Sequence, residues 1–487
     1  ASFDIECTSS CGDFPMAIKT YKRLAQDLCE NARIICENEI SIMKILDSVM
    51  TEDYYLDKTH YIHKIHMKNQ LSPKIRENIK SKCGNIKTIL HKICDDNLKT
   101  QKEIQTEEDN IRSILARDLP KLEGDPIIQI GTTFHRYGSD EIVYKHLVNL
   151  GTCDDIEGVD VIACKTESIL LEKWKEMMIR MKPDIITGYN IMGFDFKYIH
   201  DRSSELNIKE TFMVNFGKSG KIDANYKIKS LTSSALGEVN TYFYEFEGIL
   251  VIDMFVYVKA PTILTLDNYK LDNVCEHILG EKKVDLKPNE IFSKFLGTSE
   301  DRMDIGVYCI QDCVLVNRLF HKMKVLENNT GMSNVCLVPL SYIFHRGQGI
   351  KIYSLVMYEC SKRKQVIPCK EFIDDGMYEG AIVLKPKTGI YVDDPIVVFD
   401  YSSLYPSSMI AENLSHESHI LPEDVNIFIK DDKLLEDNEN LILNKIEIDG
   451  FNHYYIKYRN GNKSTIPQIL EMLINQRKAT KTKIDYK

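Results

Sequence analysis

The chain has 487 residues, enough for roughly two to four domains, and its 43% hydrophobic and 28% charged composition is that of soluble globular protein. Apolar runs such as Ile396 to Phe399 are strand-sized and far shorter than the roughly 20 residues of a membrane span, so no membrane partner is expected. The net charge of −10 argues against a protein that coats nucleic acid nonspecifically, although an enzyme that handles DNA at a metal centre can be acidic. Fourteen cysteines without a C-x-x-C pair, and no charged-then-apolar leader, indicate an intracellular protein with reduced thiols.

The first residues alternate between polar and apolar as a strand does. Asp4 and Glu6 stand two apart, so their carboxylates point to one face while Phe3 and Ile5 pack on the other. Such a pair is more commonly a solvated face than a metal site, so other acids must decide its role. Because the chain opens inside a strand and residues 466–487 form a helical pattern without a stop signal, we expect a fragment of a longer protein.

A helical insertion interrupts the pattern of strands. Between Gly12 and Gly124 a single glycine occurs, and the intervening residues are rich in Lys, Asn, Ile and Glu with helical periodicity, which predicts helices at about 16–120. Strand and turn signals return at 183–190 and at 248–255. The expected fold class is therefore mixed α/β.

Further acids occur at positions from which side chains can reach a cleft. Asp195 follows the predicted strand 185–187 at a strand-to-helix junction, while Tyr308 and Asp312 are spaced to share one helical face. Separately, these would be an N-cap and a Tyr–Asp hydrogen bond. Together with the acids of the first strand they make four hard oxygen ligands, which suit Mg²⁺ or Mn²⁺. Two such ions roughly 3.5–4 Å apart can hydrolyse a phosphodiester, so the set indicates nuclease chemistry.

Three segments resemble, in order, the exonuclease motifs of family B DNA polymerases and of DEDD-type nucleases: FDIE at 3–6, GYNIMGFD at 188–195 and YCIQD at 308–312. The resemblance implies a ribonuclease H-like 3′–5′ exonuclease in which Tyr308 orients the attacking water. It also implies that Asn190 and Phe194 contact the frayed 3′ end. The implied ligands of two Mg²⁺ or Mn²⁺ ions are Asp4, Glu6, Asp195 and Asp312.

A second signature follows the apolar run Ile396 to Phe399, which we predict to be a buried strand. Residues 400–407 read DYSSLYPS and resemble the palm motif DxxSLYPS of the same family, implying a partial α+β palm. In that motif Asp400 holds a catalytic metal with help from the Tyr401 carbonyl. In the family, the ring of the tyrosine at the position of Tyr405 closes the pocket beneath the sugar and excludes ribonucleotides. The backbone N–H groups implied to cradle the incoming triphosphate are those of Ser403, Leu404 and Tyr405.

Two further segments extend the resemblance. Tyr378 to Ala381 is similar to the family's YxGG/A motif between exonuclease and palm. Arg477 and Lys481 lie one helical turn apart and match the basic pair that approaches the triphosphate from the fingers, although by charge alone such a run is more commonly a solvated helix face. The motifs KxxxNSxYG and YGDTDS would lie beyond Lys487, so the fragment is not expected to polymerise.

These features predict an exonuclease domain at 1–340, a connector and N-terminal palm at 341–463, and the start of the fingers at 464–487. The resemblance implies a fragment of a replicative DNA-directed DNA polymerase with 3′–5′ proofreading exonuclease. Its expected partners are a DNA primer–template, a deoxynucleoside triphosphate in the full-length enzyme, and a sliding clamp or other processivity factor.

Two other functions would account for part of this pattern. A stand-alone DEDD exonuclease would share the four acids but has no reason to carry DYSSLYPS, and an inactivated polymerase retained as a scaffold or DNA-binding module would usually have lost metal-site acids. The amino-acid sequence at 9–15 and 412–416 is most similar to that of polymerases of large DNA viruses of algae and protists, with a cellular delta-type enzyme as the alternative. A viral enzyme would act in the host nucleus or at a cytoplasmic viral replication site.

Overall fold

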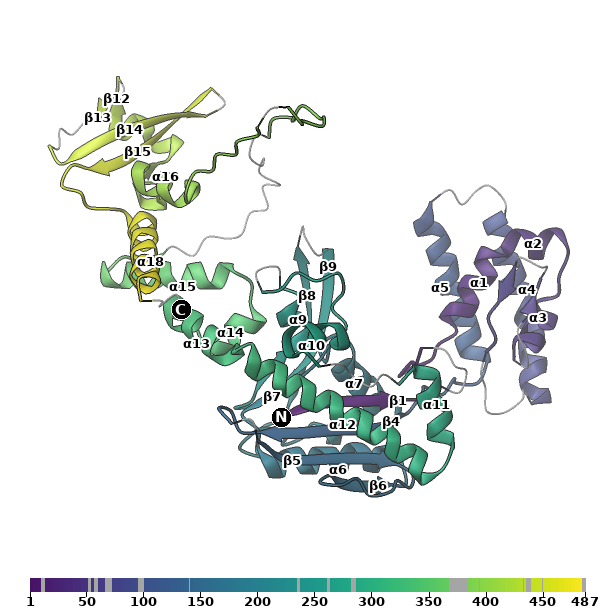
Figure 1. Ribbon diagram of the computed structural model, residues 1–487. Coiled ribbons are helices and arrows are strands. Elements are labelled where there is room, and N and C mark those ends of the chain that lie inside the picture. Colours follow the sequence, from purple (N-terminus) through teal and green to yellow (C-terminus); the bar gives the residue numbers. More distant parts are fainter. Residues whose placement is uncertain are drawn as a thin grey trace. The chain divides into compact units, whose positions relative to one another are not determined.

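The described residues of the computed structural model form two compact units, Ala1–Val325 and Leu326–Lys487 (Figure 1). Within them, no helix is both long and apolar enough to cross a membrane. The structure describes residues 1–9, 14–50, 54–56, 60–65, 72–94, 100–139, 141–233, 237–260, 263–281, 286–367, 383–393, 395–431, 433–434, 439–448 and 450–483.

A six-stranded mixed sheet organises the first unit, in the order β10-β7-β1-β4-β5-β6. Its strands are β1 (Ser2–Cys7), β4 (Ile127–His135), β5 (Ile142–Leu150), β6 (Asp160–Cys164), β7 (Ile185–Gly188) and β10 (Leu250–Asp253). Strand β1 pairs antiparallel with β4, and β4 with β5, whereas the β1–β7, β7–β10 and β5–β6 pairs are parallel. The predicted mixed α/β class is therefore confirmed.

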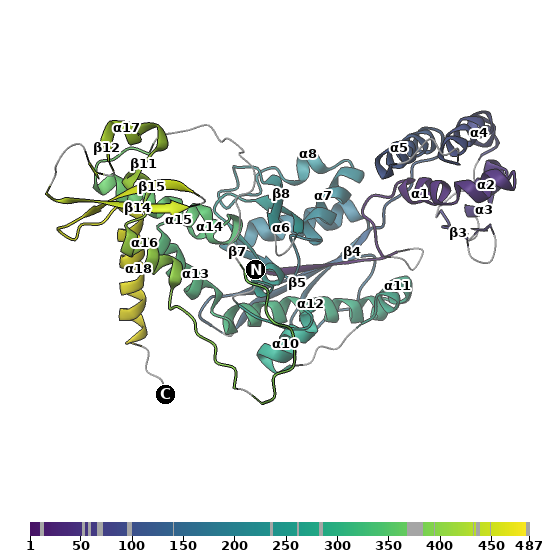
Figure 2. The same cartoon turned by 90° about the horizontal axis from the view of Figure 1, so that it is seen from above.

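Helices cover both faces of this sheet, α12 (Ser299–Lys322) on one and α6 (Glu167–Met181) with α7 (Asp195–Glu205) on the other (Figure 2). The alternation of β1 sends Phe3 toward α6 and α7, where its ring lies 5.2 Å from Trp174 and 5.3 Å from Phe196. Trp174 is fully buried, and its indole N–H donates to the Thr132 hydroxyl at 3.1 Å. Helix α12 packs on the opposite face of β1.

Shorter elements complete the first unit around the sheet. They are α8 (Lys209–Phe212), the hairpin of β8 (Asn225–Ser233) and β9 (Gly237–Glu245), α9 (Met254–Val258), α10 (Leu271–Leu279) and α11 (Pro288–Leu296). Helix α9 begins directly after β10, with Asp253 as its N-cap.

The structure places helices through the predicted insertion, around an apolar core of their own that includes Leu28, Ile45 and Ile111. A capping box of Thr100 and Glu103 starts the last of them. The helices are α1 (Lys22–Glu30), α2 (Ala32–Glu37), α3 (Ile42–Val49), α4 (Pro73–Cys94) and α5 (Gln101–Asp118), and a small sheet of β2 (Tyr54–Tyr55) and β3 (Tyr61–Ile62) was not predicted.

The second unit combines helices with short antiparallel sheets. Its helices are α13 (Val325–Cys336), α14 (Leu340–His345), α15 (Gly349–Lys362), α16 (Leu404–Glu412), α17 (Val425–Phe428) and α18 (Thr465–Lys481). Its strands are β11 (His419–Ile420), β12 (Ile429–Lys430), β13 (Lys433–Leu434), β14 (Leu441–Ile448) and β15 (Phe451–Tyr458). Helix α18 packs against α15 and α16, and the predicted C-terminal helix is confirmed.

The predicted buried strand Ile396 to Phe399 is wrong. Residues 395–400 have no regular secondary structure, and the Phe399 side chain is 92% exposed. An isolated strand leaves its backbone N–H and C=O groups unpaired, and none of the strands in the described ranges pairs with this segment, so its apolar run stays unburied. The motif Tyr378 to Ala381 lies outside the described residues.

Close packing between β4 and α12 depends on Gly131, which is paired with Asp4 of β1. A Cβ at this position would lie 2.7 Å from the Cys309 sulfur and 3.4 Å from the Cys309 carbonyl oxygen. The glycine therefore lets α12 approach the face of β1 that carries the acids.

We expect Gly131→Ala to lower the free energy of unfolding by about 1–3 kcal/mol, because the added methyl forces α12 outward. Cys309→Ala removes the closest contact, so the double variant Gly131→Ala/Cys309→Ala should be less destabilised than the sum of its single variants. Chemical denaturation of the four proteins measures this coupling, and strict additivity would contradict the packing described.

Candidate active site

The acids of β1 face α12. Asp4 is partly exposed and Glu6 is 9% exposed. Their carboxylate oxygens and the Cys309 sulfur all lie within 4.8 Å of one another, and the Cys309 thiol donates to the Asp4 backbone carbonyl at 3.6 Å. The two predicted acids of the first strand are therefore neighbours beneath α12, not a solvated face.

Asp195 joins this group from the start of α7. Its side chain is 2% exposed, and its Oδ1 accepts the backbone N–H of Ile5 at 3.2 Å, between the two acids of β1. Burial raises the pKa of the Asp195 carboxyl well above its ordinary value, and the negative charge of Asp4 raises it further, against the Ile5 hydrogen bond. Burial, and after it the nearby charge of Asp4, therefore both favour the protonated form of Asp195.

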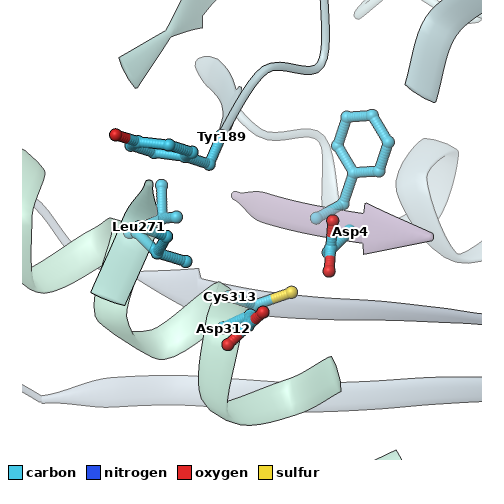
Figure 3. A pocket seen from close by; sticks show the side chains of 7 residues that line it. Asp4, Tyr189, Leu271, Asp312 and Cys313 are labelled. Atoms are coloured by element: carbon cyan, nitrogen blue, oxygen red, sulfur yellow. The ribbon is translucent and has the colours of Figure 1, made fainter. Parts of the chain in front are cut away.

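Asp312 reaches the same place from α12, four residues after Tyr308 on the helix. Asp4 and Asp312 line a cavity of about 130 Å³, together with Tyr189 and Cys313 (Figure 3). Burial raises the pKa of the Cys313 thiol. Nearby negative charges raise this pKa further, and they come from Asp4, Asp195 and Asp312. Acids from three separate segments are thus brought together, with half-buried Tyr308 on the same helix.

The loop before Asp195 has a defined backbone conformation. Asn190 is left-handed, with φ 66°, and its carbonyl accepts the N–H groups of Gly193 and Phe194, each at 2.9 Å. The Tyr189 hydroxyl donates to the Tyr269 carbonyl at 2.6 Å. The two residues predicted to contact a DNA end therefore lie on a hydrogen-bonded turn that leads directly into Asp195.

Two residues with a place in this site were missed by the sequence reasoning. Phe14 is 74% exposed, and its ring stands edge-on to that of Phe194 at 5.7 Å. In the sequence, Phe14 belongs to the segment 9–15, which follows the acids of the first strand and resembles viral polymerases, but no role was predicted for it. The second is Asp253, which was visible as an acid at the end of a predicted strand but received no role.

The residues predicted for nucleotide binding belong to the second unit. Arg477 is exposed on α18, and Ser403 has a left-handed backbone, φ 55°, immediately before α16. Within the described ranges, Asp400 belongs to no group of three potential metal ligands. The other predicted residues of this set have exposed side chains as well: Tyr401, Leu404, Tyr405 and Lys481.

Comparison with known proteins decides the family. Residues 78–274 match the family model "DNA polymerase family B, exonuclease domain", and residues 338–487 match "DNA polymerase family B". The chain belongs to DNA polymerase family B. The predicted family is confirmed.

Individual relatives that are named DNA polymerases agree with this assignment. The chain is 37% identical to a DNA polymerase of Pyramimonas orientalis virus, across 100% of the chain and 48% of the relative. It is 27% identical to a DNA polymerase of Phaeocystis pouchetii virus, across 99% and 63%, and 35% identical to the DNA polymerase delta catalytic subunit of Dictyostelium discoideum, across 75% and 31%. The chain therefore spans less than two thirds of each of these relatives, and the predicted similarity to viral polymerases is confirmed.

The raised pKa of Asp195 predicts how metal-free protein responds to pH. An unfolded aspartate ionises near its ordinary pKa, whereas folded Asp195 ionises at a higher pH, so this group's contribution to stability is lost as pH rises from about 4 through the folded pKa. Asp195→Asn cannot ionise and keeps the shape, so in EDTA it should raise Tm at pH 7 and flatten the decline between pH 4 and 7.

Thermal unfolding of both proteins in EDTA measures this effect, for which 1 kcal/mol corresponds to on the order of 2 °C. The control is Asp301→Asn, because hydrogen bonds from Thr298 hold the pKa of Asp301 below its ordinary value. This control should be less stable than the wild type at pH 7. Identical pH profiles of wild type and Asp195→Asn would contradict the electrostatic account.

Proposed function

We propose that the first unit is the 3′–5′ exonuclease of a replicative DNA polymerase and that the second unit carries the beginning of its palm and fingers. The observation that carries the proposal is the convergence of acids from β1, α7 and α12 beside one cavity. The sheet supports a ribonuclease H-like fold, because the antiparallel run β1-β4-β5 is followed on the other side of β1 by parallel β7 and β10. The match of residues 338–487 to the polymerase family model disfavours a stand-alone exonuclease.

The donor set fits a pair of divalent ions. Carboxylate oxygens are the ligands that Mg²⁺ and Mn²⁺ prefer. A cation would favour the ionised form of Asp195, whose pKa is raised by burial and by the charge of Asp4. The proposed ligands are Asp4, Glu6, Asp195 and Asp312. When bound, the two ions supply an activated water and stabilise the leaving 3′ oxygen.

The remaining side chains would bind and orient the DNA end. Tyr308 lies one helical turn before Asp312, where its hydroxyl would orient the attacking water. The ring pair of Phe14 and Phe194 offers an aromatic surface for a base at the 3′ end, and such stacking contributes about 1–3 kcal/mol per base. Asn190, on the same turn as Phe194, would contact the terminal nucleotide.

In the second unit, the start of α16 is the proposed triphosphate site. The first N–H groups of a helix lack intrahelical partners, and the left-handed Ser403 turns the chain into this helix. The amides of Ser403, Leu404 and Tyr405 would cradle the phosphates, with Arg477 and Lys481 as additional cationic ligands. Asp400 and the Tyr401 carbonyl would hold a metal.

The context of the whole polymerase is inferred from the relatives. Similarity to delta catalytic subunits and to viral DNA polymerases supports a replicative enzyme. Its proposed partners are primer–template DNA, deoxynucleoside triphosphates and a sliding clamp or other processivity factor, and its proposed site of action is the host nucleus or a cytoplasmic viral replication site. The proposed boundaries are 1–340, 341–463 and 464–487.

Purified protein with Mg²⁺ should shorten 5′-labelled single-stranded DNA from its 3′ end and release nucleoside monophosphates. Asp4→Ala and Asp312→Asn should each slow hydrolysis by about 10³-fold or more, the kinetic equivalent of several kcal/mol of lost metal stabilisation. Asp301→Asn, which changes an acid of α12 remote from the cavity, should stay within twofold of the wild type. A folded wild-type protein that leaves the DNA intact, or an equally active Asp4→Ala, would contradict the proposal.

A further inference from the structure

Asp253, at the end of β10, is a buried carboxylate that binds three backbone N–H groups. Its side chain is 4% exposed. One oxygen accepts the N–H groups of Asn190 and Phe255, each at 2.9 Å, and the other accepts that of Met192 at 2.8 Å. Because β7 and β10 are parallel neighbours with Gly188 paired to Asp253, the loop that follows β7 passes over the end of β10.

This loop determines where Asp195 begins its helix. The left-handed Asn190 directs its own N–H and that of Met192 toward β10, while its carbonyl binds the next two N–H groups of the turn. Asp195 follows Met192 by three residues and is the first residue of α7. A change in the anchorage of the loop would therefore move the carboxylate of Asp195 relative to β1.

A carboxylate is more than α9 requires at this position. As the N-cap of α9, Asp253 accepts the Phe255 N–H with one of its oxygens, and a serine would also supply such an acceptor. Burial raises the pKa of Asp253 to about 6, and the charge of Asp253 raises the pKa of Asp195. A buried carboxylate at this position is therefore unfavourable for itself and for Asp195. The hydrogen bonds that its two oxygens accept from the loop, in addition to the one from α9, explain why a carboxylate is present.

We propose that Asp253 is a positioning residue that holds the loop of Asn190 and Met192 and thereby sets the position of Asp195 in the acid cluster. Its catalytic consequence rests on the proposed exonuclease function, whereas its effect on metal binding does not. Residues that orient metal ligands from behind typically change metal affinity or activity by about 10–100-fold when they are replaced.

Two variants separate the roles of this side chain. Asp253→Ser keeps an N-cap for α9 but is too short to bind the loop, and Asp253→Asn keeps the shape but turns an amide donor toward backbone N–H groups. Asp301→Asn is the matched control, because Asp301 is also a carboxylate that accepts a backbone N–H at the start of a helix, that of Thr298 at 2.8 Å.

Three measurements on the full chain test the proposal. Amide hydrogen exchange of residues 188–194 in metal-free protein reports the anchorage of the loop, Mn²⁺ titration followed by electron paramagnetic resonance reports affinity, and single-turnover hydrolysis of single-stranded DNA at saturating Mn²⁺ reports the rate. Asp253→Ser should accelerate exchange in the loop, weaken Mn²⁺ binding by about 10–100-fold and slow hydrolysis, while the control remains within twofold in all three.

Wild-type exchange and Mn²⁺ affinity in Asp253→Ser would overturn the proposal. So would loss of the fold in both Asp253 variants, detected by near-ultraviolet circular dichroism, because the role would then be structural. If the wild type binds Mn²⁺ but leaves DNA intact, the proposed exonuclease function fails, and the exchange and titration data still decide the role of Asp253.

Discussion

Successive side chains of β1 point to opposite faces of the sheet, and the acid cluster depends on this alternation. Phe3 enters the aromatic core with Trp174, which leaves Asp4 and Glu6 on the face covered by α12. The same strand offers the Ile5 N–H to Asp195. A shift of one residue in the pairing of β1 would exchange the two faces and bury the acids in the apolar core.

The remaining contacts bring further acids to this strand from elsewhere in the chain. Gly131 allows α12 to lie close enough for Asp312 to line the cavity beside Asp4, and Asp253 anchors the loop that leads into Asp195. Burial of Asp195, together with the negative charges of Asp4 and Asp253, raises the pKa of its carboxyl. If the proposed ions bind here, metal binding and stability would be linked in this unit, because a divalent ion would offset the negative charge gathered beside Asp195.

Local signals predicted pairs of residues in the cluster, and the resemblance to the exonuclease motifs predicted that these pairs belong to one site. Strand alternation set Asp4 apart from Phe3, and helical spacing placed Tyr308 and Asp312 on one face. The hydrogen bonds that Asp253 accepts from Asn190 and Met192 could not be predicted, because they come from backbone N–H groups of a loop distant in sequence and leave no residue pattern. A role for Phe14 could not be predicted, because the sequence does not show that its exposed ring contacts the ring of Phe194.

The second unit shows where local pattern fails. The apolar run Ile396 to Phe399 has the composition of a buried strand, but a strand exists only with a hydrogen-bonded neighbour, and the strands in the described part of the chain pair elsewhere. The two-stranded sheet inside the helical insertion could not be predicted, because its two-residue strands are too short to show an alternation of polar and apolar residues.

A crystal structure of Mn²⁺-soaked protein, with anomalous scattering recorded for manganese, tests the central claim most directly. The account predicts two manganese peaks roughly 3.5–4 Å apart. Both should lie among the carboxylates of Asp4, Glu6, Asp195 and Asp312. Fully occupied manganese bound elsewhere, with no peak between β1 and α12, would contradict it.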